Sequence, residues 1–452
     1  MPVEGKGGVT GTTTPTPPRH KETQTPDSGT WNTYQVTSEA NTQKKLARQP
    51  STPDSGIGTP LSGRSISPAP SNAPDSASSE VFPSLDRVDS LPQSSKPGTA
   101  EQLVENCHIG KVLGSGANGE IHLLKDSSKT SGTSGFVLKT ARKGRELERE
   151  REIFERLGSH PNIVKCHGPV TVDGTSGLLL ERINGPTLSL ITFKLAALFE
   201  ENKLSSQEYF NVLAYLEEQK FQAAAHLEQH KTVHGDIGPH NFMFDLDSGL
   251  VKLIDFGRST PVGKAMICGN LDFTPPEAIG AFFGTKLPTA ASPTMDCYAL
   301  GQMLYKTMAS LDKDMTGEPY LHNANVNELA SSQVSVRAQR LHEALNDYAT
   351  PNDDGSYKQA LTPPAKTEVQ NDELLAESKR LKHVANFEQL YQAVEEAKQS
   401  RTQLTDLVNG LLHPVSPHRT TAQEALKHPW LTSRSIDREQ ALQTLRNLPE
   451  SV

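Results

Sequence analysis

Three polar side chains that could act together on a phosphate group lie in one short stretch of the chain, Val233–Gly257. They are Asp236, Asn241 and Asp255. Phosphoryl transfer needs one carboxylate that orients the attacking hydroxyl, and an amide oxygen and a second carboxylate that hold magnesium against the phosphates. We therefore predict that Asp236 is the catalytic carboxylate and that Asn241 and Asp255 bind the metal, Mg²⁺ or alternatively Mn²⁺.

The residues between these side chains predict a β-hairpin. An apolar run at 242–244 precedes a polar turn at 245–249, and a second apolar run follows at 251–254. A polar turn between two short apolar runs is typical of two antiparallel strands. Such a hairpin would place the loop that precedes it alongside Asp255.

A glycine-rich segment lies between two predicted strands, at 107–113 and 121–124. Glycine lets backbone amides approach phosphates, because no Cβ blocks the contact and a positive φ is readily adopted. A dinucleotide-binding fold would need a helix directly after the glycines, whereas this chain continues as a strand. The pattern favours a nucleotide-binding loop formed by Gly114, Ser115, Gly116, Ala117, Asn118, Gly119 and Ile121.

Two segments carry a resemblance to a known family. The segment 234–241 reads HGDIGPHN and the segment 255–257 reads DFG. They resemble the catalytic and magnesium loops of the protein-kinase superfamily of the eukaryotic-like (Hanks) type. The resemblance implies ATP as the phosphate donor and an α+β fold with two lobes, a small β-rich N-lobe at 101–183 and a larger helical C-lobe at 184–435.

The same resemblance assigns the residue that would hold the α- and β-phosphates of ATP. This residue is Lys139, at the end of a predicted strand. Its expected ion-pair partner is Glu150, which lies in a helix predicted over Arg145–Leu157. Glu146 and Glu152 are the alternatives in that acidic helix.

The strand predicted at Leu178–Glu181 resembles the one that enters the hinge between the lobes of a protein kinase. Leu180 would then occupy the gatekeeper position. Glu181 and Ile183 are expected to line the adenine pocket.

Motifs further along the chain resemble the rest of a protein-kinase domain. Asp296 is expected to brace the backbone of the catalytic loop, and Arg419 is the expected buried partner of Glu277. The segment His428–Leu431 resembles the usual end of such a domain. These features favour an enzyme that phosphorylates serine or threonine in proteins over a kinase of small molecules.

Three positions depart from the family pattern. Gly235 replaces an arginine that pairs with an activation-loop phosphate, so we expect activity without that phosphate. Gly238 replaces a lysine that touches the γ-phosphate, and Asn270 replaces the threonine that pairs with this lysine. Losing a cation there should slow transfer unless Asn270, Lys264 or a substrate group compensates.

These departures leave two alternatives open. One is a scaffold that binds ATP without transferring phosphate, a pseudokinase. The other is a small-molecule phosphotransferase, because the His-Gly-Asp wording also resembles aminoglycoside and choline kinases.

Composition and charge argue against several other classes. The net charge is -8 at pH 7, whereas nucleic-acid binding normally shows as a basic surplus. No run approaches the roughly 18 uninterrupted apolar residues of a membrane span. The four cysteines are far apart in sequence, which disfavours a zinc site or a disulfide framework and suits a reducing compartment. We expect a cytosolic protein, and the oligomeric state stays undetermined.

Residues 1–100 are rich in Ser, Thr, Pro and Gly, without helical or strand periodicity, and we predict a disordered tail with a secretion or regulatory role. Such a tail joined to a divergent kinase domain resembles the type III-secreted effector kinases of pathogenic bacteria. That resemblance implies action in the cytoplasm of a host cell, on host kinases or other signalling proteins. An ordinary cytosolic kinase with a regulatory tail is the alternative.

The kinase domain is predicted over 101–435. It contains an insertion at about 310–400, flanked by helices near Val334–Tyr348 and Glu373–Gln399. A short C-terminal tail follows at 436–452 and is predicted to contain one helix.

Overall fold

The computed structural model describes residues 99–116, 119–142, 147–282, 286–311, 371–381 and 386–449. All of them belong to one compact unit, Ser94–Val452. Almost all of the predicted N-terminal tail lies outside the described residues, and so does the helix predicted near Val334–Tyr348. Ala117 and Asn118 of the glycine-rich segment also lie outside them.

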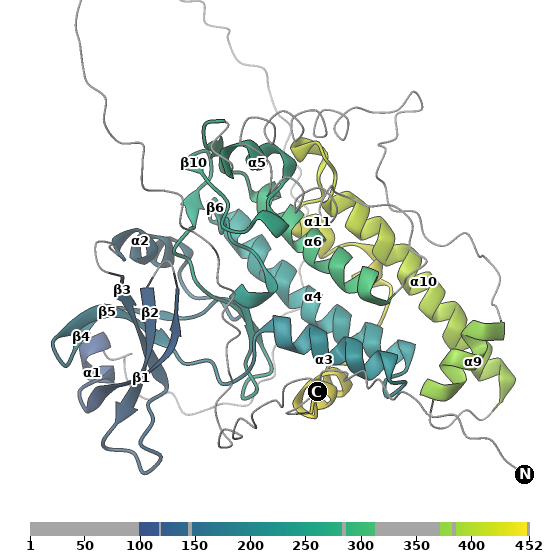
Figure 1. Cartoon of the computed structure of the whole chain (residues 1–452), viewed down its shortest axis with the longest axis horizontal. Coiled ribbons are helices and arrows are strands. Elements are labelled where there is room, and N and C mark those ends of the chain that lie inside the picture. Colours follow the sequence, from purple (N-terminus) through teal and green to yellow (C-terminus); the bar gives the residue numbers. More distant parts are fainter. Residues whose placement is uncertain are drawn as a thin grey trace, which may run out of the picture. The chain divides into compact units, whose positions relative to one another are not determined.

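Five antiparallel strands form the smaller lobe (Figure 1), in the order β1-β2-β3-β5-β4. They are β1 (Cys107–Ser115), β2 (Gly119–Asp126), β3 (Phe136–Ala141), β4 (Cys166–Val172) and β5 (Thr175–Glu181). Successive side chains of a strand point to opposite faces of the sheet. In β3, Leu138 packs in the cluster beside α1 (Ala100–Leu103), whereas Val137 packs in the main core. The sheet therefore has two buried faces.

Helix α2 (Glu148–Leu157) packs in the main core through an apolar face at i, i+3 and i+4 spacing. The sequence pattern places Leu147, Ile153, Phe154 and Leu157 roughly on one face. The last three are buried in α2, whereas Leu147 precedes the helix and packs, partly buried, against the same core. The helix begins at Glu148 rather than at Arg145. The charged residues before it carry no apolar period, so the sequence pattern did not mark where the helix starts.

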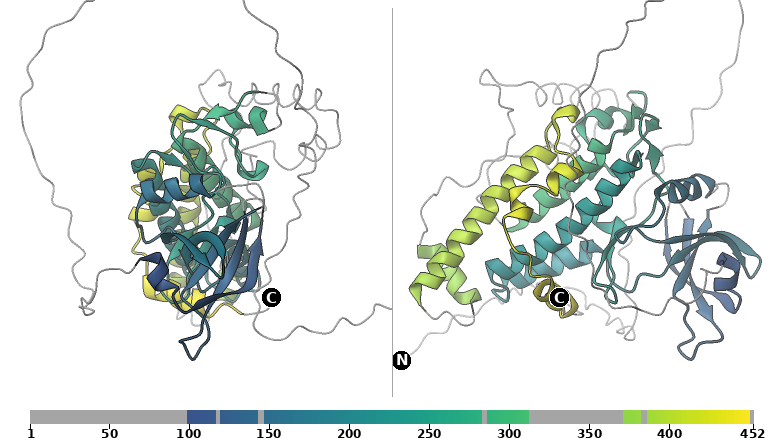
Figure 2. Two further views of the ribbon diagram at one scale, coloured as in Figure 1. Left: turned by 90° about the vertical axis from the view of Figure 1, so that its left-hand side faces the viewer. Right: turned by 180° about the vertical axis from the view of Figure 1, so that it is seen from behind.

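Helices dominate the larger lobe (Figure 2), and short strand pairs and 3₁₀ turns connect them. The helices are α3 (Leu188–Glu200), α4 (Ser206–Gln229), α5 (Pro276–Phe282), α6 (Pro293–Leu311), α9 (Asn371–Arg380), α10 (Phe387–Leu411), α11 (Ala422–Ala425), α12 (Pro429–Thr432) and α13 (Arg438–Arg446). The short strands pair as β6 (Thr232–Val233) with β9 (Thr260–Pro261), β7 (Phe242–Phe244) with β8 (Val251–Leu253), and β10 (Ala265–Met266) with β11 (Thr289–Ala290). The 3₁₀ turns are η1 (Pro239–Asn241), η2 (Leu271–Phe273) and η3 (Ser416–His418).

Helix α4 is the core helix of this lobe and leads into the catalytic stretch. Its first turn is closed by a capping box between Ser205 and Glu208. Its inward-facing apolar residues include Tyr209, Val212, Leu213, Leu216 and Leu227, all of which are buried. None of the described helices combines the length and the apolar composition needed to cross a lipid bilayer.

The single helix predicted over Glu373–Gln399 is wrong, because the structure has two helices there, α9 and α10. Helix α10 continues to Leu411 and lies alongside α4 and α6. The buried residues that hold its second half in the core are Leu404, Leu407, Val408 and Leu411. Residue 400, the predicted end of the insertion, thus falls inside a continuous helix.

The helix predicted in the C-terminal segment is confirmed as α13. It packs against α4 through the buried residues Ala441 and Leu445. The side chain of Asn211 in α4 donates a hydrogen bond to the carbonyl of Asp437 at 2.8 Å. This segment is therefore part of the folded helical lobe.

Candidate active site

The predicted hairpin is confirmed as β7 and β8, in which Phe242 pairs with Leu253. Two hydrogen bonds join its end to the preceding loop. The N–H of Ile254 donates to the carbonyl of Asn241 at 2.9 Å, and the amide nitrogen of Asn241 donates to the carbonyl of Asp236 at 2.8 Å. The hairpin thereby brings the three candidate residues of the sequence motif together at one of its ends.

Asp296, in the first turn of α6, fixes the backbone of the catalytic loop. Its two carboxyl oxygens accept hydrogen bonds from the N–H groups of His234 at 2.6 Å and Gly235 at 2.9 Å. Burial raises the pKa of the Asp296 carboxyl to about 7, against the effect of these two donors. The bracing contact predicted for Asp296 is confirmed.

The imidazole of His234 is fully buried and bridges the catalytic loop and the hairpin. Its Nδ1 accepts a hydrogen bond from the N–H of Asp236 at 3.3 Å, and its Nε2 faces the carbonyl of Ile254 at 3.1 Å. This pattern requires the neutral tautomer with the proton on Nε2. Burial lowers the pKa of His234 to about 4. Protonation would turn Nδ1 into a donor and remove the bond to Asp236.

We expect the stabilising effect of His234 to decrease as the pH falls from about 6.5 toward 4. The unfolded chain binds a proton on this histidine near pH 6.5, and the folded chain only near pH 4, so the unfolded state binds more protons in this window. The free-energy difference in unfolding between the native protein and His234→Gln should narrow by up to about 3 kcal/mol.

Denaturant titrations of both proteins at successive pH values measure this difference. The pKa values of the Asp236 and Asp296 carboxyls are raised, so their contributions to stability grow as the pH falls. Both carboxyls are present in both proteins, so these contributions cancel in the free-energy difference. Among the neighbours of His234, Asp255 favours its protonation, while His240 and Lys139 oppose it. A difference that stays constant between pH 7 and pH 4 would contradict the prediction.

Lys139 forms a buried ion-pair cluster with two carboxylates. Its Nζ lies 2.6 Å from Oε1 of Glu150 and 2.8 Å from Oδ1 of Asp255. Burial disfavours the charge on Lys139, but Asp255 and Glu150 outweigh it, so the pKa of Lys139 is raised. The predicted pairing with Glu150 is present, whereas the alternative Glu152 is exposed and Glu146 lies outside the described residues.

The side chains of Asp255 and Asn241 fit the requirements of a magnesium site. Burial would favour the neutral form of Asp255, but Lys139 outweighs it, so the pKa of Asp255 is lowered and its carboxylate stays charged. The amide nitrogen of Asn241 is used inside the loop, and among the described residues no hydrogen bond reaches its amide oxygen. Oxygen donors of this kind are those that Mg²⁺ prefers.

Within the described ranges, no group of three or more His, Cys, Asp or Glu side chains is arranged to hold a metal ion. A cation beside Asp255 and Asn241 would therefore draw its remaining ligands from phosphate oxygens and water, which is usual for Mg²⁺.

The described residues of the glycine-rich segment lie at the end of β1 and the start of β2. Strand β1 ends at Ser115, and Gly114 pairs with Ile121 across the two strands. The N–H of Gly116 donates to the carbonyl of Gly119 at 2.9 Å. Gly119 has a φ of 154°, and a Cβ there would lie 2.1 Å from a backbone oxygen of β3. Only glycine fits at this position.

Ile121, Lys139 and Leu180, which are expected around ATP, lie on the face of the sheet that packs in the main core. Ile121 is paired with Lys139 across β2 and β3, so both point to the same side. Leu180 is buried opposite Val137, and Ile183 packs against the same core.

The side chain of Glu181, a residue expected to line the adenine pocket, is bound by two other groups of the protein. Its Oε1 accepts hydrogen bonds from Nζ of Lys252 in β8 at 2.7 Å and from the N–H of Lys165 at 2.8 Å. The side chain is therefore held by these two groups. Any contact of Glu181 with adenine would come from its backbone.

The carboxyl of Asp236 is mostly buried, and burial raises its pKa to about 6. The guanidinium of Arg258 opposes this rise, and its Nε lies 4.0 Å from Oδ2 of Asp236. Sequence reasoning missed Arg258. The available signal was its position directly after the DFG segment, in a chain that lacks the lysine expected at Gly238.

Direct contacts from α2 and the catalytic loop hold the start of the activation segment. The Nε of Arg149 donates to the carbonyl of Ser259 at 3.0 Å, and its guanidinium also bonds the hydroxyl of Thr260. Ser259 in turn donates through its hydroxyl to the carbonyl of His234 at 3.3 Å.

Gly235 has a φ of 73°, and a Cβ there would lie 2.3 Å from Cε of Met266. The glycine that replaces the family arginine thus fits a strained, crowded turn.

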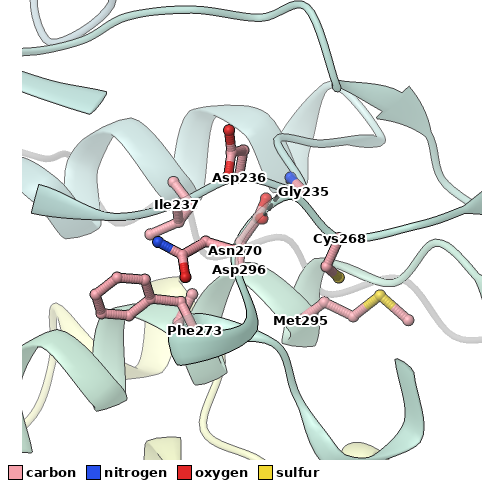
Figure 3. A pocket seen from close by; sticks show the side chains of 9 residues that line it. Gly235, Asp236, Ile237, Cys268, Asn270, Phe273, Met295 and Asp296 are labelled. Atoms are coloured by element: carbon pink, nitrogen blue, oxygen red, sulfur yellow. Dashed lines mark hydrogen bonds between the residues drawn. The ribbon is translucent and has the colours of Figure 1, made fainter. Parts of the chain in front are cut away.

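Asn270 faces the catalytic loop across a small pocket (Figure 3). Figure 3 shows Asn270 and Phe273 on one side of this pocket, and Cys268 and Met295 on the other. The side-chain oxygen of Asn270 accepts a hydrogen bond from the N–H of Asp272 at 2.9 Å. Lys264, the other residue considered as compensation for Gly238, lies in the exposed turn between β9 and β10.

The predicted pair between Arg419 and Glu277 is confirmed. The two terminal nitrogens of Arg419 contact the two carboxyl oxygens of Glu277 at 2.9 and 3.1 Å. The side chain of Arg419 is fully buried. This pair links α5, at the end of the activation segment, to the C-terminal part of the lobe.

Comparison with known proteins agrees with this geometry. Residues 107–431 match the model of the family described as protein kinase domain, so the chain belongs to this family. The predicted fold, with a β-sheet lobe followed by a helical lobe, is confirmed.

Several curated proteins are similar to part of the chain. An Aurora kinase of Schizosaccharomyces pombe is 27% identical over 261 residues, which are 54% of this chain and 66% of that protein. Protein kinase YpkA of Yersinia pseudotuberculosis is 29% identical over 136 residues, 29% of this chain and 19% of that protein. Serine/threonine-protein kinase PEPKR2 of Arabidopsis thaliana is 23% identical over 230 residues, 50% and 44% of the two chains. The matches cover no more than two thirds of these relatives.

Proposed function

We propose that this chain is a protein kinase that transfers the γ-phosphoryl group of ATP to serine or threonine hydroxyls of protein substrates. The observation that carries the proposal is the convergence of Asp236, Asn241 and Asp255 at one end of the β7–β8 hairpin. The pair of Lys139 and Glu150 lies directly beside them. A relative named as a serine/threonine-protein kinase supports the choice of acceptor.

The reaction follows from the positions of these groups. The substrate hydroxyl oxygen bonds to the γ-phosphorus, and the bond between this phosphorus and the bridging oxygen of ADP breaks. The hydroxyl proton passes to Asp236, and ADP leaves with the electron pair. Lys139, oriented by Glu150, binds the α- and β-phosphates. Asp255 and Asn241 would hold magnesium, which neutralises phosphate charge when it is bound.

Incubation of the full chain with γ-labelled ATP and magnesium tests the proposal, with generic protein acceptors and aminoglycosides in parallel. Label on serine or threonine of a protein is the expected result. Label on the aminoglycosides alone would assign the chain to the small-molecule phosphotransferases. Nucleotide binding without transfer to any acceptor would make it a pseudokinase scaffold.

We expect phosphatase treatment to leave this activity intact, because Arg149 holds the activation segment through Ser259 and Thr260 without a phosphate group. The variant Arg149→Ala should lower the rate of transfer by up to about 100-fold, since misplacing a reacting group by about 1 Å has an effect of this size. Arg151→Ala in the same helix is the matched control, because Arg151 pairs with Glu148 and Glu155 of that helix.

The rate of label transfer before and after phosphatase treatment measures the first expectation. Complete loss of activity after the treatment would contradict it. Equal transfer rates of Arg149→Ala and Arg151→Ala would contradict the expectation that Arg149 holds the activation segment in place.

We further propose that the protein acts in the cytosol, and that it is a type III-secreted effector acting on kinases or other signalling proteins of a host cell. The similarity to a Yersinia protein kinase and the Ser/Thr/Pro-rich composition of residues 1–100 support this proposal. Phosphoproteomics of eukaryotic cells that produce the chain or its Asp236→Ala variant tests it. Transfer by the purified chain without new phosphorylation of cellular proteins would contradict it.

A further inference from the structure

A positive charge near the transferred phosphoryl group favours phosphate transfer. In the protein-kinase pattern a lysine at position 238 supplies it, and Gly238 supplies none. Lys139 is engaged by Glu150 and Asp255. Lys264 lies in an exposed turn. Among the residues that the structure describes, Arg258 is a cation that lies beside the catalytic carboxylate, with 4.0 Å between its Nε and Oδ2 of Asp236.

The backbone that carries Arg258 is held firmly. The next residue, Ser259, is fully buried and bonds both Arg149 and the carbonyl of His234. Strand β9 then pairs with β6, with Thr260 opposite Val233. The start of the Arg258 side chain is therefore fixed relative to the catalytic loop.

Gly269 lets the two charged groups approach each other. A Cβ at this position would lie 2.1 Å from Oδ1 of Asp236 and 2.7 Å from Cδ of Arg258. Both distances are shorter than real Cβ contacts, so any side chain at 269 would displace one of the two. The absence of a side chain here is a requirement of the Asp236–Arg258 arrangement.

The Arg258 guanidinium also keeps hydrogen-bonding capacity for a ligand. Its side chain is 37% exposed, whereas that of Asp236 is 14% exposed. The separation of 4.0 Å from Asp236 is longer than a hydrogen bond. A planar guanidinium with several N–H donors suits the oxygens of a phosphoryl group.

We propose that Arg258 is a catalytic residue that contacts the γ-phosphoryl group of ATP and supplies the positive charge missing at Gly238. This inference rests on the proposed kinase function. Arg258 forms and breaks no covalent bond. It donates hydrogen bonds to the γ-phosphoryl oxygens while the substrate oxygen bonds to phosphorus, the bond to the bridging oxygen of ADP breaks, and the proton passes to Asp236.

Two measurements on the full chain test the role of Arg258. One is the ratio of ATP to ADP affinity in the presence of magnesium, which needs no transfer. The other is the rate of transfer from labelled ATP. Arg258→Ala should reduce the ATP-to-ADP affinity ratio by about 10-fold or more, as expected for a lost charge-assisted hydrogen bond, with ADP affinity unchanged. It should slow transfer by about 100-fold.

A second variant separates a contact with phosphate from a structural effect. Adding Gly238→Lys to Arg258→Ala returns a cation to the catalytic loop. Gly238 has an extended backbone, with a φ of -172°. A Cβ there would meet the ring of His240 at 2.7 Å, and this ring can turn aside. We expect the double variant to recover part of the ATP preference and of the rate. Arg438→Ala, a change at an exposed ion pair of α13, is the matched control.

The outcomes distinguish this inference from the proposed function. If the native chain prefers ATP through Arg258 but transfers nothing, the transferase function fails and the phosphate contact of Arg258 stands. If the native chain transfers phosphate and Arg258→Ala matches it in rate and affinity ratio, the inference alone is overturned. Equal loss of ATP and ADP affinity in Arg258→Ala, or no rescue by Gly238→Lys, also overturns it. A native chain that binds no nucleotide overturns both.

Discussion

The variant Asp236→Ala is expected to transfer phosphate about 10² to 10⁴ times more slowly than the native chain, because it lacks the group that receives the hydroxyl proton. Asp236 suits this task because the catalytic loop holds it in place. The ring of His234 accepts from its N–H, and the amide of Asn241 donates to its carbonyl. Single-turnover transfer from labelled ATP to a protein acceptor measures the effect. Nucleotide affinity should change little, since Asp236 acts on the acceptor.

Two companion variants sharpen the test of Asp236. Asp236→Asn keeps the shape of the side chain and removes the charge, so a loss as large as that of Asp236→Ala would assign the effect to proton transfer. Asp247→Ala, in the exposed turn of the same hairpin, is the matched control and should keep full activity. Transfer by Asp236→Ala at more than a tenth of the native rate would contradict the assignment of Asp236.

Replacing Arg419 with alanine is expected to lower the free energy of unfolding by about 3 to 5 kcal/mol, because it leaves the carboxylate of Glu277 without its buried partner. Arg419 also donates to the carbonyls of Thr294 at 2.9 Å and His413 at 3.0 Å, so these acceptors lose their donor too. Denaturant unfolding of the native chain and the variant measures the difference. Arg438→Ala, at a surface pair, should change stability by less than about 1 kcal/mol.

A double-mutant cycle with Glu277→Ala tests the physical reason for this effect. If the bare carboxylate causes most of the loss, removing Glu277 as well should recover part of the stability. Additive losses would show instead that Arg419 acts mainly through the carbonyls that it binds. A loss below about 1 kcal/mol for Arg419→Ala alone would contradict the prediction.

The contacts of the active site divide into those that motif spacing could predict and those that it could not. The hairpin, the bracing by Asp296 and the pair of Arg419 with Glu277 were predicted, because they join residues that belong to recognisable motifs. Arg258 follows the DFG segment and belongs to no recognisable motif, so motif spacing could not predict its contact with Asp236. The contact of Arg149 with Ser259 likewise depends on which face α2 turns toward the activation segment.

One prediction failed because the pattern around it was local. The helix predicted over Glu373–Gln399 was drawn across a break before Phe387 and ended too early. Its true end at Leu411 is set by burial against α4 and α6, which the polar pattern of its first half does not indicate.

The sequence by itself determined the family, the two-lobed fold and the candidate residues of the catalytic motif, because apolar periodicity and motif spacing are properties of residues close together in the chain. The tertiary structure alone decided which cation stands beside Asp236, how the activation segment is held without an arginine at position 235, and where α10 ends. These features depend on contacts between residues far apart in sequence, such as Arg149 with Ser259. Such contacts exist only once the helix faces and loops have packed.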